Sequence, residues 1–308
     1  LKNDAVELKE ALNVNELATK VKELLTQGGV VTLNESITLT TAPDHPTSGG
    51  KDGIRIKDGQ TVDLNLAGQT FTAAFETPSH RMFQVAVGTL NISDGTIVSS
   101  ANLKADGNPS LYGIAWVGYD GEATLNIENT NIVYTTDPTS NKPASLFLVN
   151  DSGTLNIKDS TVTFSNAMGA EVLGTATFEN VTFKAAGEGT WADICEGVSN
   201  GGTANIKSGT YIAADGGQYA ANACVGVLPT GGTLNISGGT FEGNLYLDAD
   251  GGKTATINVT GGTFDGKAFN SITEGEWRDM LVGCDATEKA TVVITGAGTN
   301  NVTIKLAK

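Results

Sequence analysis

Basic residues, histidines, cysteines and long apolar runs are all scarce in this chain of 308 residues. The 19 Lys and Arg stand against 34 Asp and Glu, which gives a net charge of −15. A surface of that charge repels phosphate backbones and bare anionic membranes, so we expect no nucleic-acid partner. No apolar run reaches the roughly 18 residues that a membrane-spanning helix needs. The sequence therefore predicts a soluble chain without a transmembrane segment.

Only three cysteines are present, Cys195, Cys224 and Cys284. They are too few for a disulfide scaffold in a chain of this length, so we expect free thiols. A disulfide or a reactive thiol stays open as the alternative, because Cys195 and Cys224 each lie in a short apolar run just ahead of a repeat. The chain begins at Leu1 without a signal peptide, and we expect it to be the mature or trimmed part of a longer product.

What the sequence has in abundance is one short polar motif, TLNISGGTF, and its variants. Within each copy the second and fourth positions are apolar, as in Leu234 and Ile236, which predicts a strand with one buried face. A turn rich in Gly, Asp and Asn follows, and then a second short strand with an inward residue such as Phe241. The copies begin at Thr61, Thr89, Thr124, Thr154, Thr175, Thr203, Thr233, Thr256 and Thr291.

The spacing of the copies indicates how the chain is wound. Most copies follow another apolar run, such as MFQVAV or GIAWVG, so each unit supplies three strands. A unit of this size buries no core alone, whereas stacked units align Leu and Ile into a continuous core. The sequence therefore predicts an all-β fold, a parallel β-helix of about nine to ten three-strand coils. A β-propeller is the alternative, but it needs about 40 residues per blade, more than most intervals provide.

Both ends of the chain fit one elongated domain over residues 1–308. In residues 13–29, NVNELATKVKELLTQGG, the apolar positions follow helical spacing, and Gly28 and Gly29 stop the helix. An amphipathic helix is expected to cover the open end of a solenoid, so residues 1–29 form an N-terminal capping helix region. Residues 30–308 then form the coils, and the final segment NNVTIKLAK closes the last turn.

The helix that leads into TLNIxGGTF units resembles the right-handed parallel β-helix proteins of the pectate-lyase-like superfamily, especially bacterial cell-surface members of unassigned function. The resemblance covers nearly the whole chain. It implies an exported protein, extracellular or on the bacterial cell surface. Its fold hosts lyases, hydrolases, adhesins and tailspikes, so the resemblance fixes no activity. Polygalacturonase-like members carry NTD, DD, GHG and RIK segments. This chain has only RIK, at Arg55 to Lys57, which we treat as coincidence.

Acidic residues recur at one corner of the predicted coil and are the candidate catalytic groups. They are Asp120, Asp151, Asp248 and Asp250. Carboxylates that share a groove serve acid/base hydrolysis of a glycosidic bond, and Asp248 with Asp250 also has the spacing to chelate calcium. No other cofactor is expected. The competing interpretation is ordinary turn chemistry, because Asp before Gly is a common turn pair.

Aromatic residues beside charged ones are the candidate ligand-binding groups. GTWADI places Trp191 near Asp193, and GEWRDM places Trp277 beside Arg278 and Asp279. Aromatic faces with neighbouring carboxylate and guanidinium groups bind sugar rings by stacking and hydrogen bonding. The competing interpretation is that these aromatic residues pack loops against the rod.

The outward Thr and Asn positions of the motif form columns, which we interpret chiefly as stabilising cross-strand ladders. Two functions are consistent with these features. The first is a noncatalytic adhesin-like or glycan-binding protein whose partner is a polysaccharide or cell-surface glycan. The alternative is a polysaccharide lyase or glycoside hydrolase that uses the corner carboxylates. The even repeats and the scarcity of basic residues favour the first.

Overall fold

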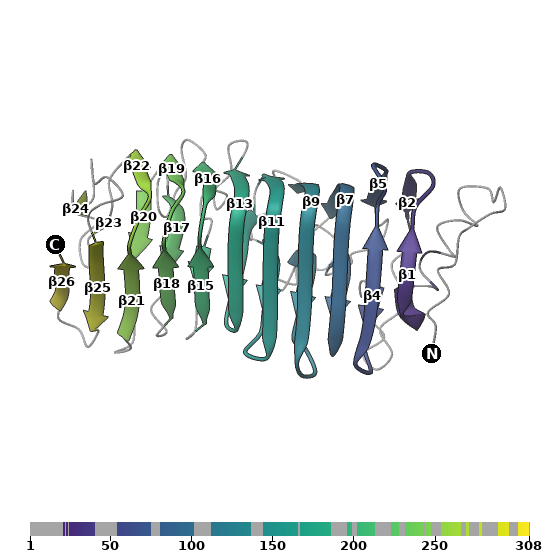
Figure 1. Ribbon diagram of the computed structural model, residues 1–308, viewed down its shortest axis with the longest axis horizontal. Coiled ribbons are helices and arrows are strands. Elements are labelled where there is room, and N and C mark those ends of the chain that lie inside the picture. Colours follow the sequence, from purple (N-terminus) through teal and green to yellow (C-terminus); the bar gives the residue numbers. More distant parts are fainter. Residues whose placement is uncertain are drawn as a thin grey trace.

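The computed structural model describes residues 21, 23, 25–40, 54–74, 81–101, 112–136, 144–165, 167–185, 196–198, 202–212, 223–227, 232–242, 244–247, 254–265, 269–270, 277–278, 289–295 and 301–307. The described chain is almost entirely β-structure arranged in long parallel sheets, which is compatible with a parallel β-helix. The strands of the first sheet follow one another in sequence order along the longest axis of the molecule (Figure 1). The predicted all-β fold with parallel strands is therefore confirmed.

The first sheet has 16 strands. Its main path runs through β1 (Gly29–Thr32), β4 (Gln60–Asn65), β7 (Gly88–Ala101), β9 (Ala123–Thr136), β11 (Gly153–Phe164), β13 (Thr175–Ala185), β15 (Thr203–Ile206), β18 (Thr233–Ile236), β21 (Thr254–Val259), β25 (Lys289–Thr295) and β26 (Asn301–Ala307). Short strands extend it beside this path, namely β2 (Ile37–Leu39), β5 (Thr70–Ala73), β16 (Gly209–Ile212), β19 (Thr240–Glu242) and β22 (Thr263–Asp265).

Smaller sheets are formed by the segments between these strands. The second sheet consists of β3 (Ile54–Ile56), β6 (Phe83–Val85), β8 (Tyr112–Val117), β10 (Ala144–Val149) and β12 (Ala167–Val172). The third consists of β14 (Glu196–Val198), β17 (Ala223–Val227) and β20 (Asn244–Leu247), and a two-stranded pair of β23 (Phe269–Asn270) and β24 (Trp277–Arg278) completes the set. The chain thus alternates between the first sheet and a second layer, as the three-strand unit predicts.

The register of the first sheet confirms the alignment of eight motif copies. Each leading threonine pairs with the leading threonine of the next copy, from Thr61 through to Thr256. Because equivalent residues lie side by side, every apolar position of one copy falls beside an apolar position of the next. The upstream runs MFQVAV, GIAWVG, SLFLVN, AEVL, ACVGVL and NLYL also contain strands as predicted, and MLVGC lies outside the described residues.

The turn inside each copy takes one of two forms. In four copies the sixth position adopts a left-handed backbone, at Asp94, Asn129, Asp159 and Asn180, and the two predicted strands merge into β7, β9, β11 and β13. In three later copies the left-handed residue is the seventh, at Gly209, Gly239 and Gly262, and the strands stay separate. In the β13 copy the seventh residue, Val181, is β-branched and disfavours positive φ, which agrees with the left-handed Asn180; the β7 copy, however, has its left-handed residue at Asp94 although Gly95 follows. The prediction of two separate strands is therefore wrong for four copies.

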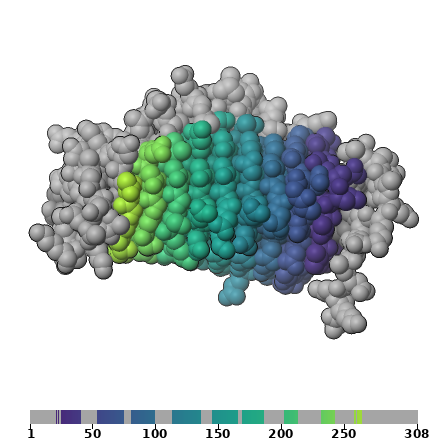
Figure 2. All heavy atoms as spheres, turned by 45° about the horizontal axis from the view of Figure 1, so that its top comes forward, coloured from purple at the N-terminus to yellow at the C-terminus, as the bar shows by residue number. Residues whose placement is uncertain are grey.

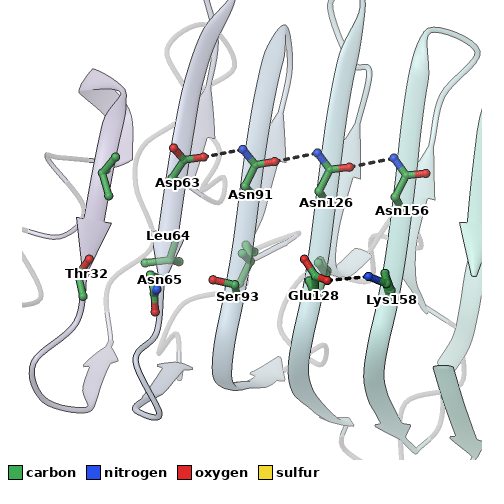
Figure 3. Close-up of a pocket in the computed structure, with 13 residues that line it drawn as sticks. Thr32, Asp63, Leu64, Asn65, Asn91, Ser93, Asn126, Glu128, Asn156 and Lys158 are labelled. Carbon is green, nitrogen blue, oxygen red and sulfur yellow. Dashed lines mark hydrogen bonds and ion pairs between the residues drawn. The ribbon is translucent and has the colours of Figure 1, made fainter. Parts of the chain in front are cut away.

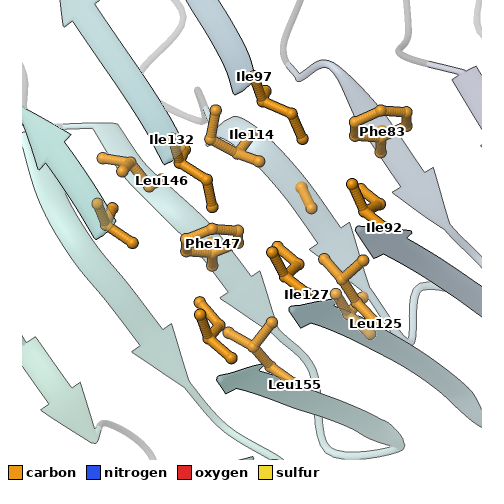
Figure 4. Packing of buried hydrophobic residues seen from close by; sticks show 14 of the residues in the cluster. Phe83, Ile92, Ile97, Ile114, Leu125, Ile127, Ile132, Leu146, Phe147 and Leu155 are labelled. Carbon is orange, nitrogen blue, oxygen red and sulfur yellow. The ribbon is translucent and has the colours of Figure 1, made fainter. Parts of the chain in front are cut away.

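The core lies between the sheets. Leu125 and Leu155 of the first sheet point toward Ile114 and Phe147 of the second, and side chains from successive strands fill the space in layers (Figure 4). Phe183, Tyr211 and Phe241 add an aromatic column, with ring centroids 5.8 Å and 5.0 Å apart. Burial stabilises the fold by roughly 1.5 to 3 kcal/mol for each such side chain. The described residues follow one another as successive bands in the space-filling view (Figure 2).

The two ends of the described chain depart from the parallel pattern. Val21, Glu23 and Leu25 to Gln27 are helical, Val21 and Leu25 are fully buried in the core, and Gly28 and Gly29 end the helix with positive φ.

The ninth motif copy is not a coil, and that prediction is wrong. Its strand β25 pairs antiparallel with β21, so Thr291 lies opposite Asn258 and not opposite Thr256. Strand β26 then pairs antiparallel with β25. Strands β25 and β26 follow each other in the chain and both alternate apolar and polar residues. Such consecutive strands can pair as an antiparallel hairpin, in which the strand direction reverses. The final strand therefore pairs with this hairpin partner and not with a preceding coil.

Candidate functional site

The outward face of the first sheet carries a ladder of asparagine side chains (Figure 3). The Nδ2 atoms of Asn91, Asn126 and Asn156 donate to Asp63, Asn91 and Asn126 at 2.5 Å, 2.7 Å and 2.8 Å respectively. Thr177 interrupts the column beside Asn156. The ladder resumes where Asn235 donates to Asn205 and Asn258 donates to Asn235, both at 2.9 Å. The predicted cross-strand ladder is thus confirmed for the asparagine column.

Charged residues form a second row two positions further along the strands. Lys158 binds Glu128 at 2.9 Å, and Lys207 binds Glu179 at 3.1 Å. The hydrogen bond to Glu128 raises the pKa of Lys158 above its ordinary value. At the corner, the Asn129 amide donates to Asp94 at 2.9 Å and, with a hydrogen bond from Ser93, lowers the pKa of that carboxyl. These contacts join neighbouring strands in the same way as the asparagine ladder.

A shallow groove of about 590 Å³ runs over the ladder and this charged row. The residues on its floor include Asn91, Asn126 and Asn156, whose amides already bond to one another. A ligand that used these amides would have to break existing hydrogen bonds before forming new ones. The groove is therefore a stabilised surface, and its polar groups are poor candidates for ligand binding.

The outward face of the second sheet differs from that of the first, because the row of residues that crosses it does not repeat one residue type from strand to strand. Arg55 of β3 lies beside Gln84 of β6, and Gln84 lies beside Trp116 of β8. The row continues through Leu148 of β10 to Glu171 of β12. Because cross-strand partners share a face, these five side chains form one continuous strip.

The N-terminal part of this strip gathers charged and aromatic groups into an arginine–aromatic cluster, which comprises Arg55, Arg81, Gln84, Trp116, Tyr119 and Asp120. Arg55 forms an ion pair with Asp120, and its guanidinium lies 5.9 Å from the centroid of the Tyr119 ring. The Arg81 guanidinium lies 4.3 Å from the centroid of the Trp116 ring. Both distances are within the range of cation–π attraction.

The two aromatic rings of the cluster meet edge to face. The centroids of Trp116 and Tyr119 are 4.5 Å apart, and their planes are inclined by 78°. Tyr119 has 40% of its surface exposed and is the one large hydrophobic residue that is exposed among the described residues. The cluster therefore presents an aromatic surface to solvent beside a guanidinium and a carboxylate.

Gln84, the cross-strand neighbour of Arg55 and Trp116, is fully buried, with 0% of its surface exposed. Neither its Nε2 nor its Oε1 has a hydrogen-bond partner in the part of the chain that the structure describes, and the buried Nε of Arg55 has none there either. A buried polar group without a partner costs roughly 1 to 3 kcal/mol. Such groups are rare in folded proteins, and each calls for an explanation such as an ordered water, an ion or a functional role.

The structure separates the two corner aspartates that it describes. Asp120 belongs to the arginine–aromatic cluster, where Arg55 binds its carboxylate. Asp151 lines a groove of about 550 Å³ at the start of the first-sheet strands, together with Glu122 and the leading threonines Thr89, Thr124, Thr154 and Thr175. The lining of that groove does not include Asp120, so it does not bring these two described aspartates together.

The other predicted site residues are not placed by the described structure. Asp248, Asp250, Trp191, Asp193 and Asp279 lie outside the described residues, as do Cys195 and Cys284. Trp277 and Arg278 form strand β24, which pairs antiparallel with β23, and their side chains are outside the described part. The calcium hypothesis at Asp248 and Asp250 is therefore untested. Within the described residues, no group of three metal-binding side chains is found, and no helix is long and apolar enough to span a membrane.

Sequence reasoning missed four members of the cluster, namely Arg81, Gln84, Trp116 and Tyr119, and dismissed Arg55. A usable signal was present, because alternation within IRI, MFQVAV and GIAWVG places Arg55, Gln84 and Trp116 opposite the buried face. Scarcity was a second signal: the chain has three arginines, and two of them lie here.

Comparison with known proteins does not identify a relative of this chain. No model of a known protein family, no curated protein and no solved structure gives a significant match to the chain.

Proposed function

We propose that this chain is a noncatalytic glycan-binding protein whose binding site is the arginine–aromatic cluster. The observation that supports the proposal most directly is the exposed Tyr119 ring, flanked by Trp116, Arg55 and Asp120 above the unsatisfied amide of Gln84. An aromatic face beside planar polar groups suits a sugar ring, because the ring stacks through its C–H face and its hydroxyls form hydrogen bonds.

The proposal also covers the fold family, the N-terminal cap and the location of the protein. We propose a right-handed parallel β-helix of the pectate-lyase-like kind, with the helix that ends at Gln27 covering its N-terminal opening. Val21 and Leu25 support the cap, because their burial removes the apolar end of the core from water. An exported, adhesin-like protein at the bacterial cell surface is consistent with the acidic repeat surface, since a net charge of −15 favours solubility.

A glycan array followed by calorimetric titration tests the proposed site. Trp116→Ala and Tyr119→Ala are expected to weaken binding of the best glycan at least tenfold, which corresponds to about 1.4 kcal/mol. Lys158→Ala, which removes an exposed side chain from the first sheet, serves as the matched control and is expected to bind as the wild type does. Unchanged binding by folded Trp116→Ala and Tyr119→Ala variants would contradict the proposed site.

A polysaccharide lyase or glycoside hydrolase is the second candidate. The groove that is lined by Glu122, Asp151 and four threonines favours this function, because glycoside hydrolases generally use a pair of carboxylates to cleave the glycosidic bond. An assay for reducing sugars and unsaturated products across a polysaccharide panel separates the two functions. Product release by the wild type that is lost in Glu122→Gln and Asp151→Asn would establish the enzyme, whereas binding without product favours the noncatalytic protein.

A further inference from the structure

The charges on the second-sheet strip balance, and this balance bears on the kind of glycan that fits. Arg55 is neutralised by direct contact with Asp120. Arg81 packs on Trp116, and Glu171 lies in the same strip two strands from Trp116. Over the cluster and the rest of the strip, the described residues include two arginines and two carboxylates, although Asp120 is the one carboxylate within the cluster itself. With a net charge of −15 over the whole chain, an anionic polysaccharide meets long-range repulsion.

The unsatisfied groups of the cluster require both a donor and an acceptor from the ligand. The Nε of Arg55 and the Nε2 of Gln84 are buried donors without partners, and the Oε1 of Gln84 is a buried acceptor without one. A carboxylate or sulfate group only accepts hydrogen bonds, so it leaves Oε1 of Gln84 unsatisfied. A hydroxyl group accepts one hydrogen bond and donates another, and it therefore matches the cross-strand pair of Arg55 and Gln84.

The residues around Gln84 differ in their exposure to solvent. The side chain of Asp120 is 41% exposed and that of Arg55 is 20% exposed, whereas Gln84 beside them is buried. Exposure thus decreases from Tyr119 and Asp120 through Arg55 to Gln84. Because Gln84 is fully buried, a ligand hydroxyl reaches its amide only if neighbouring side chains such as Arg55 move.

We propose that the arginine–aromatic cluster selects a neutral saccharide, and that Gln84 determines this specificity by bonding a sugar hydroxyl that inserts beside Arg55. The proposal rests on the proposed glycan-binding function and specifies its ligand class. Asp120 has a positioning role, because its carboxylate holds the Arg55 guanidinium and cancels the charge that would otherwise attract acidic glycans.

The test compares neutral gluco-, manno- and galacto-oligosaccharides with galacturono-oligosaccharides and sulfated oligosaccharides by calorimetry. The wild type is expected to bind a neutral oligosaccharide at least tenfold more tightly than any acidic one. Its dissociation constant is expected to change less than twofold between 50 and 500 mM NaCl, a range over which the Debye length falls from above about 10 Å to below it and the screening of exposed ionic contacts increases. Tighter binding of an acidic oligosaccharide that weakens in high salt would overturn the neutral class while leaving the glycan-binding function intact.

Two variants separate specificity from folding. Gln84→Leu keeps the size of the side chain and removes the unsatisfied amide, so it is expected to be at least as resistant to thermal unfolding as the wild type, yet to bind the neutral glycan tenfold more weakly. Asp120→Asn is expected to increase affinity for galacturono-oligosaccharides several-fold. Wild-type binding by Gln84→Leu would refute the role of Gln84, and absence of any glycan binding by the wild type would refute the proposed function as well.

Discussion

The asparagine ladder provides the sharpest test of how the coils are held together, through the substitution Asn126→Ala. Asn126 donates to Asn91 at 2.7 Å and accepts from Asn156 at 2.8 Å, so its truncation removes two hydrogen bonds. It also leaves the Oδ1 atom of Asn91 and the Nδ2 atom of Asn156 half-buried without those partners. At about 1 kcal/mol for each bond, the free energy of unfolding is expected to fall by about 2 kcal/mol.

Urea unfolding followed by circular dichroism measures this loss. With a dependence of about 3 kcal/mol per molar urea, the upper end of the range for small proteins, the midpoint is expected to fall by about 0.7 M. Thr177→Ala is the matched control, because Thr177 occupies the same column where no asparagine ladder bond is formed, and it is expected to cost well under 1 kcal/mol. Equal losses for the two variants would refute the contribution of the ladder.

The remaining predictions concern the core, the ladder and two titrating groups. Leu234→Asp places a charge in a fully buried position and is expected to unfold the protein. Asn235→Asp loses the amide that donates to Asn205 and is expected to lower the free energy of unfolding by only about 1 to 2 kcal/mol. The opposite ranking of the two variants in urea unfolding would contradict the strand register. Burial raises the pKa of Tyr134, whose hydroxyl has no hydrogen-bond partner among the described residues, so its contribution to stability is present below about pH 10 and declines as the pH rises toward the folded-state pKa. Tyr134→Phe is therefore expected to move alkaline unfolding to higher pH in a titration followed by circular dichroism. An unchanged transition would contradict this reasoning. The hydrogen bonds from Asn129 and Ser93 lower the pKa of the Asp94 carboxyl, so the stability that the ionised carboxylate contributes is present above about pH 4 and is lost as the pH falls through the folded-state pKa. Asn129→Ala is expected to raise the pKa of Asp94 in a carboxyl NMR titration. An unchanged pKa would contradict the role of this hydrogen bond.

The fold was predictable because its determinants are local and repeated. Alternation in TLNI places Leu234 and Ile236 inside, and both are buried. The leading threonines align because each copy buries the same positions, and a shift of one residue would expose every apolar side chain. This repetition allowed eight copies to be placed in register from their residue pattern, although the intervals between them are uneven.

The end of the repeat and the form of its turns were less predictable. Copy nine keeps the alternation of a strand, but alternation does not specify strand direction, and β25 pairs antiparallel with β21. The merging of two strands in β13 depends on whether the sixth or the seventh residue takes positive φ. Val181 disfavours positive φ at the seventh position of that copy, but Gly95 does not do so in β7, so the residue at this position does not by itself predict the turn.

The candidate site was predicted least well, because its residues come from different coils and obey no repeat. Asp120 was singled out as a corner carboxylate, but its partner Arg55 lies 65 residues earlier in the chain. Only the pairing of β3, β6 and β8 brings Arg55, Gln84 and Trp116 together. Sequence proximity instead favoured Trp191 and Trp277, because each has a charged neighbour beside it in the chain.

The most direct test of the central claim, that the arginine–aromatic cluster binds a saccharide, is a fluorescence titration in which Trp116 is the only tryptophan. The chain has three tryptophans, so Trp191→Phe combined with Trp277→Phe leaves Trp116 as the sole indole emitter. Titration with a neutral oligosaccharide that calorimetry shows to bind is predicted to give a saturable change in Trp116 emission, and that change is predicted to disappear in a further Tyr119→Ala variant. Oligosaccharide binding that persists in calorimetry while Trp116 emission stays constant, or binding lost with Trp191 and Trp277, would contradict the account.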